Sequence, residues 1–260
     1  MKKKILCLSG WGQKFDSLEF IFNDQTFDPF FVSSLDYSHF AAVDEFFEFV
    51  KNNFAQQNKV GALDAGSQGL KPVEVENLQP EIVVGWSLGG QLALRLIEKK
   101  ILTPKLLILI APPFQLLKDA RIQAGMASAT FKKFRDDFAD APDKTLKQFA
   151  ILTAMNDRNA SDIARNLDVN DKNFAQLVYW LDELARFSCF DVDFSGMPRV
   201  LYFHGAGDMI VHVSQAQYFK ERIENFHQEI FLQCGHATQL SDVGRMREII
   251  AEEIAEQSLL

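Results

Sequence analysis

The stretch Gly85-Trp86-Ser87-Leu88-Gly89-Gly90 joins a short apolar run to an amphipathic one. Ile82-Val83-Val84 before it is typical of a buried strand, and residues 91–98 after it have the spacing of a helix. A G-x-S-x-G pattern between a strand and a helix predicts a nucleophile elbow, a strained turn that exposes the serine oxygen. The glycines are needed because larger side chains would collide with the turn. We therefore expect Ser87 to be a nucleophile, the alternative being a structural turn.

The length of the chain is greater than that of one ordinary domain but normal for a single α/β enzyme with an insertion. The chain has 260 residues, of which 47% are hydrophobic, enough for a large core. Its 24 Phe residues far outnumber its 3 Trp and 4 Tyr residues, so we expect most of these rings to serve packing. The net charge of −8 argues against a nucleic-acid partner, because nucleic-acid phosphates require a basic face.

The cysteines and the first residues bear on the cellular compartment. Cys7, Cys189 and Cys234 cannot all pair, and each adjoins apolar residues, so buried reduced thiols are expected. No ligand spacing predicts a metal, and we expect no cofactor. The apolar run after the basic start at Lys2 ends after about five residues, which is too short for a signal peptide and predicts a first strand. No apolar stretch approaches the ~20 residues of a membrane span. We expect a soluble, cytoplasmic monomer.

Short apolar runs alternate with longer amphipathic stretches along the chain. This alternation is typical of βαβ units and predicts a mainly parallel central sheet flanked by helices. The expected strands are residues 4–9, 30–34, 82–86, 105–111, 199–204 and 228–234. The expected helices are residues 43–57, 87–99, 214–223 and 238–256.

Two regions interrupt this alternation. Residues 56–80 are rich in Gly, Gln and Asn and predict a long surface loop. Residues 112–193 have helical periodicity without a convincing strand. We therefore expect a core from residues 1–111 and 195–260, with residues 112–194 as a helical lid. Such an insertion would lie over the carboxyl edge of the sheet, where α/β sheets bind their ligands.

A serine hydroxyl needs a base that takes its proton and a third group that orients this base. Among five histidines, His236 is favoured because it follows the last expected strand, and the neighbouring Gly235 permits a tight turn. The alternative for His236 is a turn histidine that bonds the backbone. The others are His39, His204, His212 and His227.

The orienting acid is expected between the serine and the histidine in chain order. Asp208 lies in the glycine-rich loop after the strand at residues 199–204 and is the favoured candidate. Asp191 and Asp193 are alternatives, but they precede that strand. A turn or helix-capping role is the other interpretation of Asp208.

An oxyanion hole requires two N–H donors. Leu88, which follows the nucleophile at the start of a helix, is expected to supply one. The loop Ser9-Gly10-Trp11-Gly12 is expected to supply the other from Trp11, since its glycines let the backbone approach a substrate. The indole of Trp11 would then form a wall of the pocket. An ordinary turn with a core tryptophan is the alternative.

The elbow, the early Gly10-Trp11-Gly12 and the Asp208 and His236 loops together resemble the α/β-hydrolase superfamily. More narrowly, the chain resembles the biotin-synthesis carboxylesterases that demethylate pimeloyl-[acyl-carrier protein] methyl ester. The resemblance covers nearly the whole chain and includes residues 144–152 and 201–205. Ser9 is a departure, because many relatives carry histidine there. Backbone N–H donation does not depend on that side chain, so the change alters pocket polarity more than chemistry.

This resemblance implies an acyl-carrier protein as the partner that presents the acyl chain. Such an acidic partner is expected to meet basic residues of the lid. The resemblance places these contacts at Lys144, Lys147, Arg158 and Arg165. Interleaved aspartates leave a solvated helix face as the alternative. Trp11, Leu88 and Phe149 are expected to bind the substrate, although Phe149 could equally belong to the core of the lid.

The expected reaction is hydrolysis of a carrier-bound methyl ester in biotin precursor synthesis. Ser87, His236 and Asp208 would form the triad, and an acyl-enzyme would be the intermediate. On the same fold, a general short-chain carboxylesterase or thioesterase, or a lyase of the menaquinone-pathway type, is the alternative. A non-enzymatic interaction protein is disfavoured because no triad residue or elbow glycine is missing.

Overall fold

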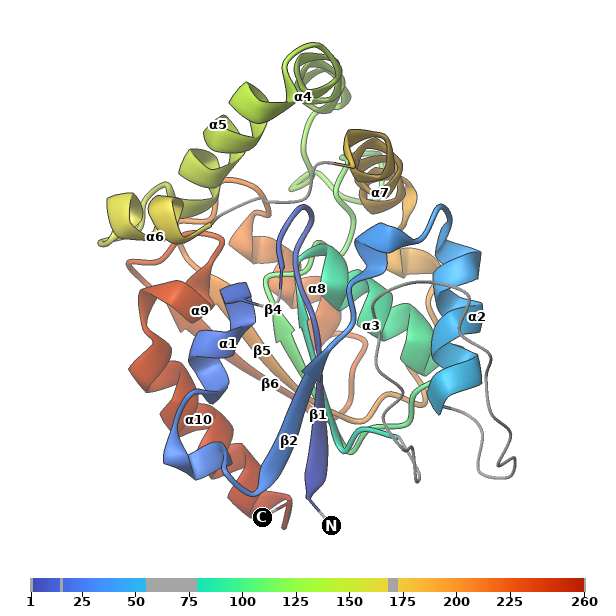
Figure 1. Cartoon of the computed structure of the whole chain (residues 1–260), viewed down its shortest axis with the longest axis vertical. Coiled ribbons are helices and arrows are strands. Elements are labelled where there is room, and N and C mark those ends of the chain that lie inside the picture. The colour runs from blue at the N-terminus through green and yellow to red at the C-terminus, as the bar shows by residue number, and fades with distance from the viewer. Residues whose placement is uncertain (1, 15, 55–78, 168–172, 260) are drawn as a thin grey trace.

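The computed structural model describes residues 2–14, 16–54, 79–167 and 173–259, which form a sheet between layers of helices (Figure 1). All neighbouring strands of the sheet are parallel, and their order is β2-β1-β3-β4-β5-β6. The strands are β1 (Lys3–Leu8), β2 (Phe30–Ser34), β3 (Ile82–Trp86), β4 (Leu106–Ile110), β5 (Arg199–Gly205) and β6 (Phe226–Phe231). The predicted α/β class with a parallel sheet is therefore confirmed.

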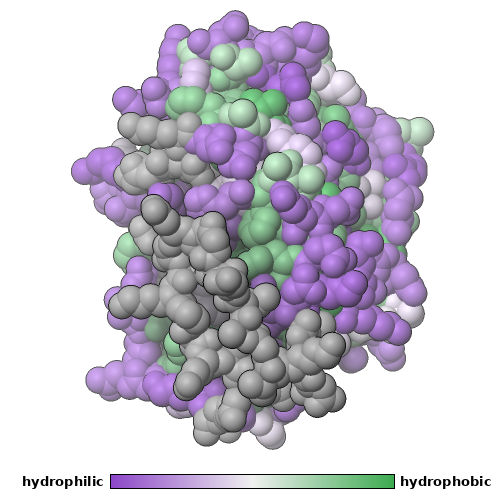
Figure 2. Space-filling view, turned by 45° about the vertical axis from the view of Figure 1, so that its right-hand side comes forward, coloured by the Kyte–Doolittle hydropathy of each residue, from purple (hydrophilic) through white to green (hydrophobic). Residues whose placement is uncertain are grey.

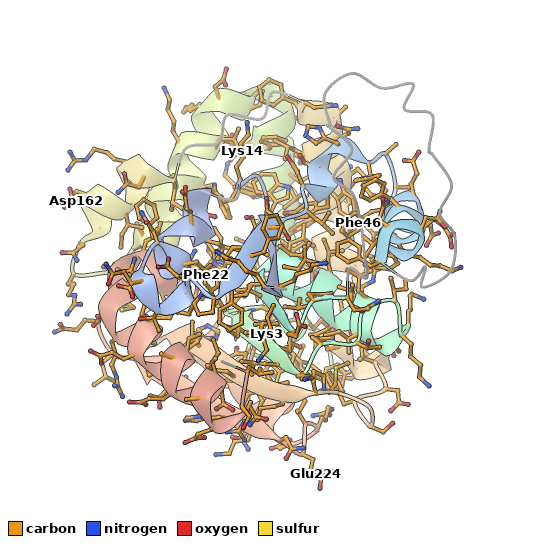
Figure 3. All side chains as sticks on the ribbon, turned by 60° about the horizontal axis from the view of Figure 1, so that its bottom comes forward. Lys3, Lys14, Phe22, Phe46, Asp162 and Glu224 are labelled. Atoms are coloured by element: carbon orange, nitrogen blue, oxygen red, sulfur yellow. The ribbon has the colours of Figure 1, made fainter. Side chains whose placement is uncertain are left out.

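Each face of the sheet carries its own hydrophobic core, because side chains alternate along every strand. Leu6 and Leu8 of β1 face one core, and Ile5 and Cys7 face the other. Phe46 and Phe22, both labelled in Figure 3, belong to the first and the second core respectively. Helices of the first core are α2 (Val43–Phe54), α3 (Leu88–Glu98) and α8 (Ala216–Lys220). Those of the second are α1 (Asp16–Phe22), α9 (Thr238–Ser241) and α10 (Val243–Glu256).

The chain between β4 and β5 forms helices that lie above the carboxyl ends of the strands in Figure 1. They are α4 (Ser128–Asp140), α5 (Pro142–Ala154), α6 (Ala160–Asn166) and α7 (Phe174–Arg186). The first helix begins only at Ser128. In the preceding loop, Gln115 forms an isolated bridge with Ser188, and Leu117 forms one with Met126 of the same loop. On the face turned forward in Figure 2, apolar residues gather near the middle, with hydrophilic residues beside them on the right.

Several element boundaries differ from the sequence prediction. The last strand is β6 (Phe226–Phe231) rather than residues 228–234, because it pairs with β5 from Val200↔Phe226 to Gly205↔Phe231. The stretch predicted as one helix at 238–256 is two helices, because Asp242 leaves the helical conformation and its side chain accepts the N–H of Arg245. Aspartate favours such a helix-capping position.

Other elements were missed or shortened. Helix α1 was not predicted, and the predicted helix 214–223 is a 3₁₀ turn, Val213–Gln215, followed by α8. Most of the predicted loop 56–80, together with the end of the predicted helix 43–57, lies outside the described residues.

The three cysteines are buried and free, as the sequence predicts. In the part of the chain that the structure describes, we find no helix with the length and apolar character of a bilayer span.

Candidate active site

Ser87 occupies a strained turn between β3 and α3. Its φ of 54° and ψ of −118° lie in a region that non-glycine residues rarely adopt. Gly89 lets the start of α3 approach β1, because a Cβ atom there would lie 2.1 Å from the carbonyl oxygen of Leu8. Only 5% of Ser87 is exposed, and its hydroxyl has no hydrogen-bond partner among the described residues. The predicted strand–turn–helix context of this serine is present.

Asp208 and His236 meet through their side chains at the ends of two neighbouring strands. Nδ1 of His236 lies 2.6 Å from Oδ2 of Asp208, and both side chains are buried. The other carboxylate oxygen, Oδ1, accepts the N–H groups of Ile210 and Val211 at 2.8 and 2.9 Å. The carboxylate can only accept, so Nδ1 carries the proton, and Nε2 is left with a lone pair.

The electrostatic surroundings keep Asp208 ionised. Burial by itself would raise the pKa of this carboxyl group. The charge of His236, together with hydrogen bonds from His204 and His236, outweighs burial and holds the pKa well below its ordinary value. A stable negative charge therefore faces the imidazole of His236.

His236 also lies beside the elbow. The indole N–H of Trp86, the residue before Ser87, donates to the carbonyl oxygen of His236 at 3.1 Å, and the two rings lie 5.9 Å apart. Nε2 of His236 is buried and lacks a hydrogen-bond partner within the described ranges. The structure thus brings the predicted base and acid together at the edge of the sheet that carries the elbow.

The other candidates for base and acid lie elsewhere, with one exception. His39 pairs with Asp36, His212 bonds Ser214, and His227 lies between Glu229 and Glu253. His204 is the exception, since its Nε2 lies 3.0 Å from Oδ2 of Asp208. Asp191 is exposed and lies 3.7 Å from Arg121, and Asp193 accepts the N–H of Ser195.

The loops that carry Asp208 and His236 touch through their backbones. A Cβ atom at Gly205 would lie 2.1 Å from the carbonyl oxygen of Gly235, so no larger residue fits at this contact. The N–H of Gly207 donates to the carbonyl oxygen of Cys234 at 3.0 Å. The glycine-rich sequence before Asp208 is therefore required for close approach of two loops.

Trp11 links the loop after β1 to the helices between β4 and β5. Its indole N–H donates to the carbonyl oxygen of Leu177 in α7 at 2.8 Å. Its ring packs edge-on against Phe134 and Phe138 of α4 and Phe149 of α5, at 5.2 to 5.8 Å. Trp11 is therefore a buried contact between two parts of the molecule, and Phe149 belongs to the same aromatic cluster.

The two backbone donors expected for an oxyanion hole are unused. Neither the N–H of Trp11 nor that of Leu88 has an acceptor among the residues the structure describes. Their segments are adjacent, because a Cβ atom at Gly10 would lie 3.1 Å from the ring of Trp86. Within the described residues, neither N–H group is therefore engaged by another acceptor.

Sequence reasoning missed a buried carboxylate that holds the His236 loop. Asp157, in the turn after α5, accepts the N–H of Gly235 at 3.2 Å and the hydroxyl of Ser241 through Oδ2. Nearby, the carbonyl oxygen of Thr153 accepts the N–H of His236 at 3.0 Å. In sequence, an aspartate between Asn156 and Arg158 resembles an ordinary polar turn, so the pattern contained no signal of this contact.

The four basic residues predicted to meet a carrier protein fall into two groups. Lys144 and Lys147 are exposed on α5 and have no ion pair or hydrogen bond in the described ranges. Arg158 pairs with Asp242 at 2.9 Å, and Arg165 pairs with Asp162. Two of the four charges are therefore already neutralised within the chain.

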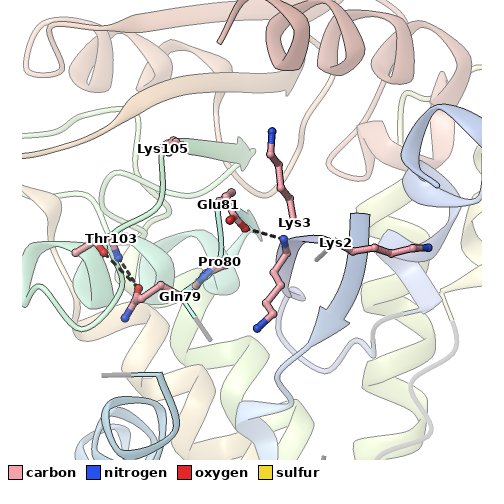
Figure 4. Close-up of a pocket in the computed structure, with 8 residues that line it drawn as sticks. Lys2, Lys3, Gln79, Pro80, Glu81, Thr103 and Lys105 are labelled. Atoms are coloured by element: carbon pink, nitrogen blue, oxygen red, sulfur yellow. Dashed lines mark hydrogen bonds between the residues drawn. The ribbon is translucent and has the colours of Figure 1, made fainter. Parts of the chain in front are cut away.

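Two surface hollows lie away from Ser87. One, of about 270 Å³, lies at the amino ends of β1, β3 and β4 and is lined partly by Lys2, Lys3, Lys4 and Lys105 (Figure 4). The other, of about 410 Å³, lies near the end of β6 and includes Arg158 and Cys234. Neither is lined by the elbow serine or by His236.

Residues 6–251 match the model of the α/β hydrolase family. The chain belongs to this family. It is 31% identical over 194 residues to the pimeloyl-[acyl-carrier protein] methyl ester esterase of Aromatoleum aromaticum, covering 69% of this chain and 74% of that protein. It is 28% identical over 190 residues to the biotin biosynthesis bifunctional protein BioHC of Teredinibacter turnerae, covering 68% of this chain and 33% of that protein.

A solved structure agrees with this assignment of the fold. The esterase of Exiguobacterium antarcticum has a TM-score of 0.74 and 16% identity, with 97% of this chain and 92% of that chain covered. At this identity the likeness concerns the fold alone. Family membership and the esterase relatives identify the chain as a carboxylic ester hydrolase.

Proposed function

We propose that this α/β hydrolase is a serine carboxylesterase that hydrolyses the methyl ester of a pimeloyl chain carried by acyl-carrier protein, in biotin precursor synthesis. The observation that carries the chemistry is the buried contact of 2.6 Å between His236 and Asp208, beside a serine in a strained turn. The resemblance to a relative named for this substrate supports the choice of ester.

In the proposed reaction, Ser87 Oγ attacks the ester carbonyl while Nε2 of His236 takes its proton. Asp208 holds the imidazole in the tautomer whose Nε2 is a base and stabilises the imidazolium that forms. The N–H groups of Trp11 and Leu88 bind the oxyanion of the tetrahedral intermediate. His236 returns its proton to the leaving methoxide, so methanol departs and an acyl-enzyme remains. Water, deprotonated by His236, then releases the free carboxylate and regenerates Ser87.

We assign residues 112–194 to a lid over this site, with the remaining residues as the core. The contacts of Trp11 with α4, α5 and α7 support a lid that rests on the loop after β1. Phe149 would line the acyl channel from this side. Lys144 and Lys147 are the basic residues available to an acidic carrier protein, whereas Arg158 and Arg165 already have carboxylate partners.

The test compares two substrates and one variant. Purified protein is assayed on the methyl ester of pimeloyl-acyl-carrier protein and on p-nitrophenyl butyrate, with Ser87→Ala as the variant and circular dichroism as the check of folding. We expect the carrier-bound ester to be the better substrate by kcat/KM, and Ser87→Ala to lose on the order of 10⁴–10⁶-fold in kcat on both.

Each part of the proposal has its own contrary result. A Ser87→Ala variant that keeps more than about a tenth of the wild-type rate would remove Ser87 as the nucleophile. Efficient hydrolysis of p-nitrophenyl butyrate with slow turnover of the carrier-bound ester would leave a general short-chain esterase. Complementation of a strain that lacks its biotin-pathway esterase, by wild type and not by Ser87→Ala, would support the substrate in cells.

A further inference from the structure

Asp208 is contacted by a second histidine, which the proposed triad does not use. His204 lies at the end of β5 and is fully buried. Its Nε2 lies 3.0 Å from Oδ2 of Asp208, the same oxygen that His236 contacts, and 2.9 Å from the carbonyl oxygen of Val211. Its Nδ1 lies 2.7 Å from the hydroxyl of Tyr202. Two imidazole rings therefore converge on one carboxylate oxygen.

The partners of His204 determine where its proton lies. Both atoms near Nε2 are acceptors, so Nε2 carries a hydrogen. Tyr202 is fully buried, and in the described part of the chain its hydroxyl has only His204 as a hydrogen-bond partner. If Nδ1 also carried a hydrogen, the hydroxyl of Tyr202 would be a buried donor without an acceptor, which is costly. Tyr202 therefore donates to Nδ1, and the ring is neutral with its hydrogen on Nε2.

The other titratable groups around this contact are few. Burial raises the pKa of Tyr202 well above its ordinary value, and Asp208 and Cys189 add to this effect, so the hydroxyl keeps its proton. On the far side of Asp208 lies His236. The oxygen Oδ2 thus has an imidazole on each side, while Oδ1 is occupied by two backbone N–H groups.

We infer that His204 is a positioning residue of the proposed triad, whose Nε2–H fixes the Asp208 carboxylate and takes up part of its negative charge. This inference rests on the proposed function, because it assigns a role in the orientation of His236. His204 touches no reacting atom and acts only through Asp208. Without it, Oδ2 has one donor fewer and the carboxylate can rotate away from Nδ1 of His236. The remaining charge also stabilises the imidazolium form of His236 more strongly.

The test uses three variants and the small ester p-nitrophenyl butyrate. His204→Phe removes the N–H and keeps the ring volume, whereas His204→Gln restores an N–H near the place of Nε2. Tyr202→Phe is the matched control, since it breaks the same buried chain of hydrogen bonds at the end away from Asp208. Rates are divided by the concentration of active sites, titrated with a fluorophosphonate, so that partial misfolding does not count as lost catalysis.

For His204→Phe we expect a loss in kcat of roughly 10–100-fold, with KM nearly unchanged. This is the range seen in metal sites when a residue that orients a ligand by a hydrogen bond is removed. The acidic limb of its kcat/KM profile should move to higher pH. His204→Gln should recover most of kcat and the wild-type limb, and Tyr202→Phe should keep both. A role in folding alone would change the active fraction and the melting temperature, but not the limb.

The outcomes separate this inference from the proposed function. Suppose that His204→Phe has the wild-type kcat per active site and the wild-type acidic limb of the kcat/KM profile, while Ser87→Ala is inactive. Then His204 does not position Asp208, and the triad stands. If Ser87→Ala is active, the triad itself fails. Independently of activity, ¹⁵N spectra of histidine-labelled protein should show one buried neutral ring protonated at Nε2 that disappears in His204→Phe, and a ring protonated at Nδ1 there would overturn the inference.

Discussion

Two regions of this molecule place a side-chain N–H donor at the same distance from an aspartate, with different consequences. At the sheet edge, His236 lies 2.6 Å from Asp208, and both are buried. On α4, Lys132 lies 2.6 Å from Asp136, and their side chains are 76% and 51% exposed. The distance is equal in the two cases, so the difference in burial determines how strongly each pair interacts. Water and salt screen the exposed pair, whereas the buried pair interacts at a lower effective dielectric constant.

The two regions also differ in what assembles them. The pairs on α4 lie four residues apart on one helix and need no tertiary contact. The Asp208–His236 contact joins the ends of β5 and β6, and it is supported by Asp157 from beyond α5. A change at the sheet edge should therefore affect catalysis and stability together. A change on the exposed helices should be confined to the binding of a charged partner.

Among the substitutions that test this contrast, Asp208→Asn is expected to have the largest effect on kcat. The amide cannot accept from Nδ1 in the same way, so His236 loses its fixed tautomer, and kcat should fall by roughly 10⁴-fold on p-nitrophenyl butyrate. Asp191→Asn is the matched control, because Asp191 is exposed and its carboxylate lies beside Arg121. It should keep its rate within about twofold, as surface substitutions usually do. A crippled Asp191 or Asp193 variant would show that the acid is misassigned.

Acid should destabilise wild type more than Asp208→Asn. Burial raises the pKa of Asp208, but the two histidines lower it by more, so the pKa lies well below its ordinary value. The folded protein therefore holds a charged carboxylate where the unfolded chain binds a proton. The resulting stability is present above about pH 4, the ordinary pKa of aspartate, and is lost as the pH falls from there towards the folded pKa. Urea unfolding between about pH 5 and pH 3 measures it, and parallel losses in both proteins would contradict it.

A smaller effect is expected for Asp157→Asn. Oδ2 of Asp157 accepts the Gly235 N–H and the Ser241 hydroxyl, and Oδ1 accepts the N–H of Asn159, so an amide with one oxygen leaves at least one of these donors without its acceptor. The free energy of unfolding should fall by about 1–3 kcal/mol. Gly235 directly precedes His236, so the loss of its hydrogen bond should shift the imidazole slightly. We expect kcat to fall by roughly 10-fold, which is less than a displacement of a catalytic group by about 1 Å can cost. Lower stability with an unchanged kcat per active site would confine Asp157 to folding.

The smallest effect on chemistry, and one restricted to the carrier-bound ester, is expected for Lys144→Glu combined with Lys147→Glu. At low salt kcat/KM on this substrate should fall by roughly 10-fold, because steering by charge is lost. The loss should shrink with added salt, since such contacts are screened over about 8–10 Å at physiological ionic strength. Hydrolysis of p-nitrophenyl butyrate should stay within about threefold, because both side chains are exposed on α5 and are assigned no part in the chemistry.

The matched control for this pair is Lys132→Glu combined with Lys133→Glu. It makes the same change in net charge, but at lysines that already pair with Asp136 and Asp137. We expect less than about twofold loss on the carrier-bound ester, since exposed pairs of this kind contribute little. Equal losses in both double variants would mean that the net charge of the protein, rather than the exposed lysines of α5, governs its encounter with the carrier protein.

Local sequence was informative about the sheet and the elbow. Strand β3 and the turn at Ser87 follow from an apolar run, two glycines and a helical spacing, all within residues 82–98. Asp208 and His236 could be predicted because parallel strands bring their carboxyl ends to one edge. The limits of β6 and the break at Asp242 could not, because strand pairing and a side-chain cap set them.

By itself, the sequence determined the fold class and the residue types proposed for the reaction, since both depend on short patterns that repeat along the chain. Tertiary structure alone decided which groups surround them. His204 appears in sequence as one histidine among five, and only the turn after β5 brings its Nε2 to Oδ2 of Asp208. Asp157 reaches Gly235 across 78 positions of the chain. The His204–Asp208 contact spans only four residues, but like the contact of Asp157 it depends on how the folded chain orients and buries both groups, which the residue pattern does not show.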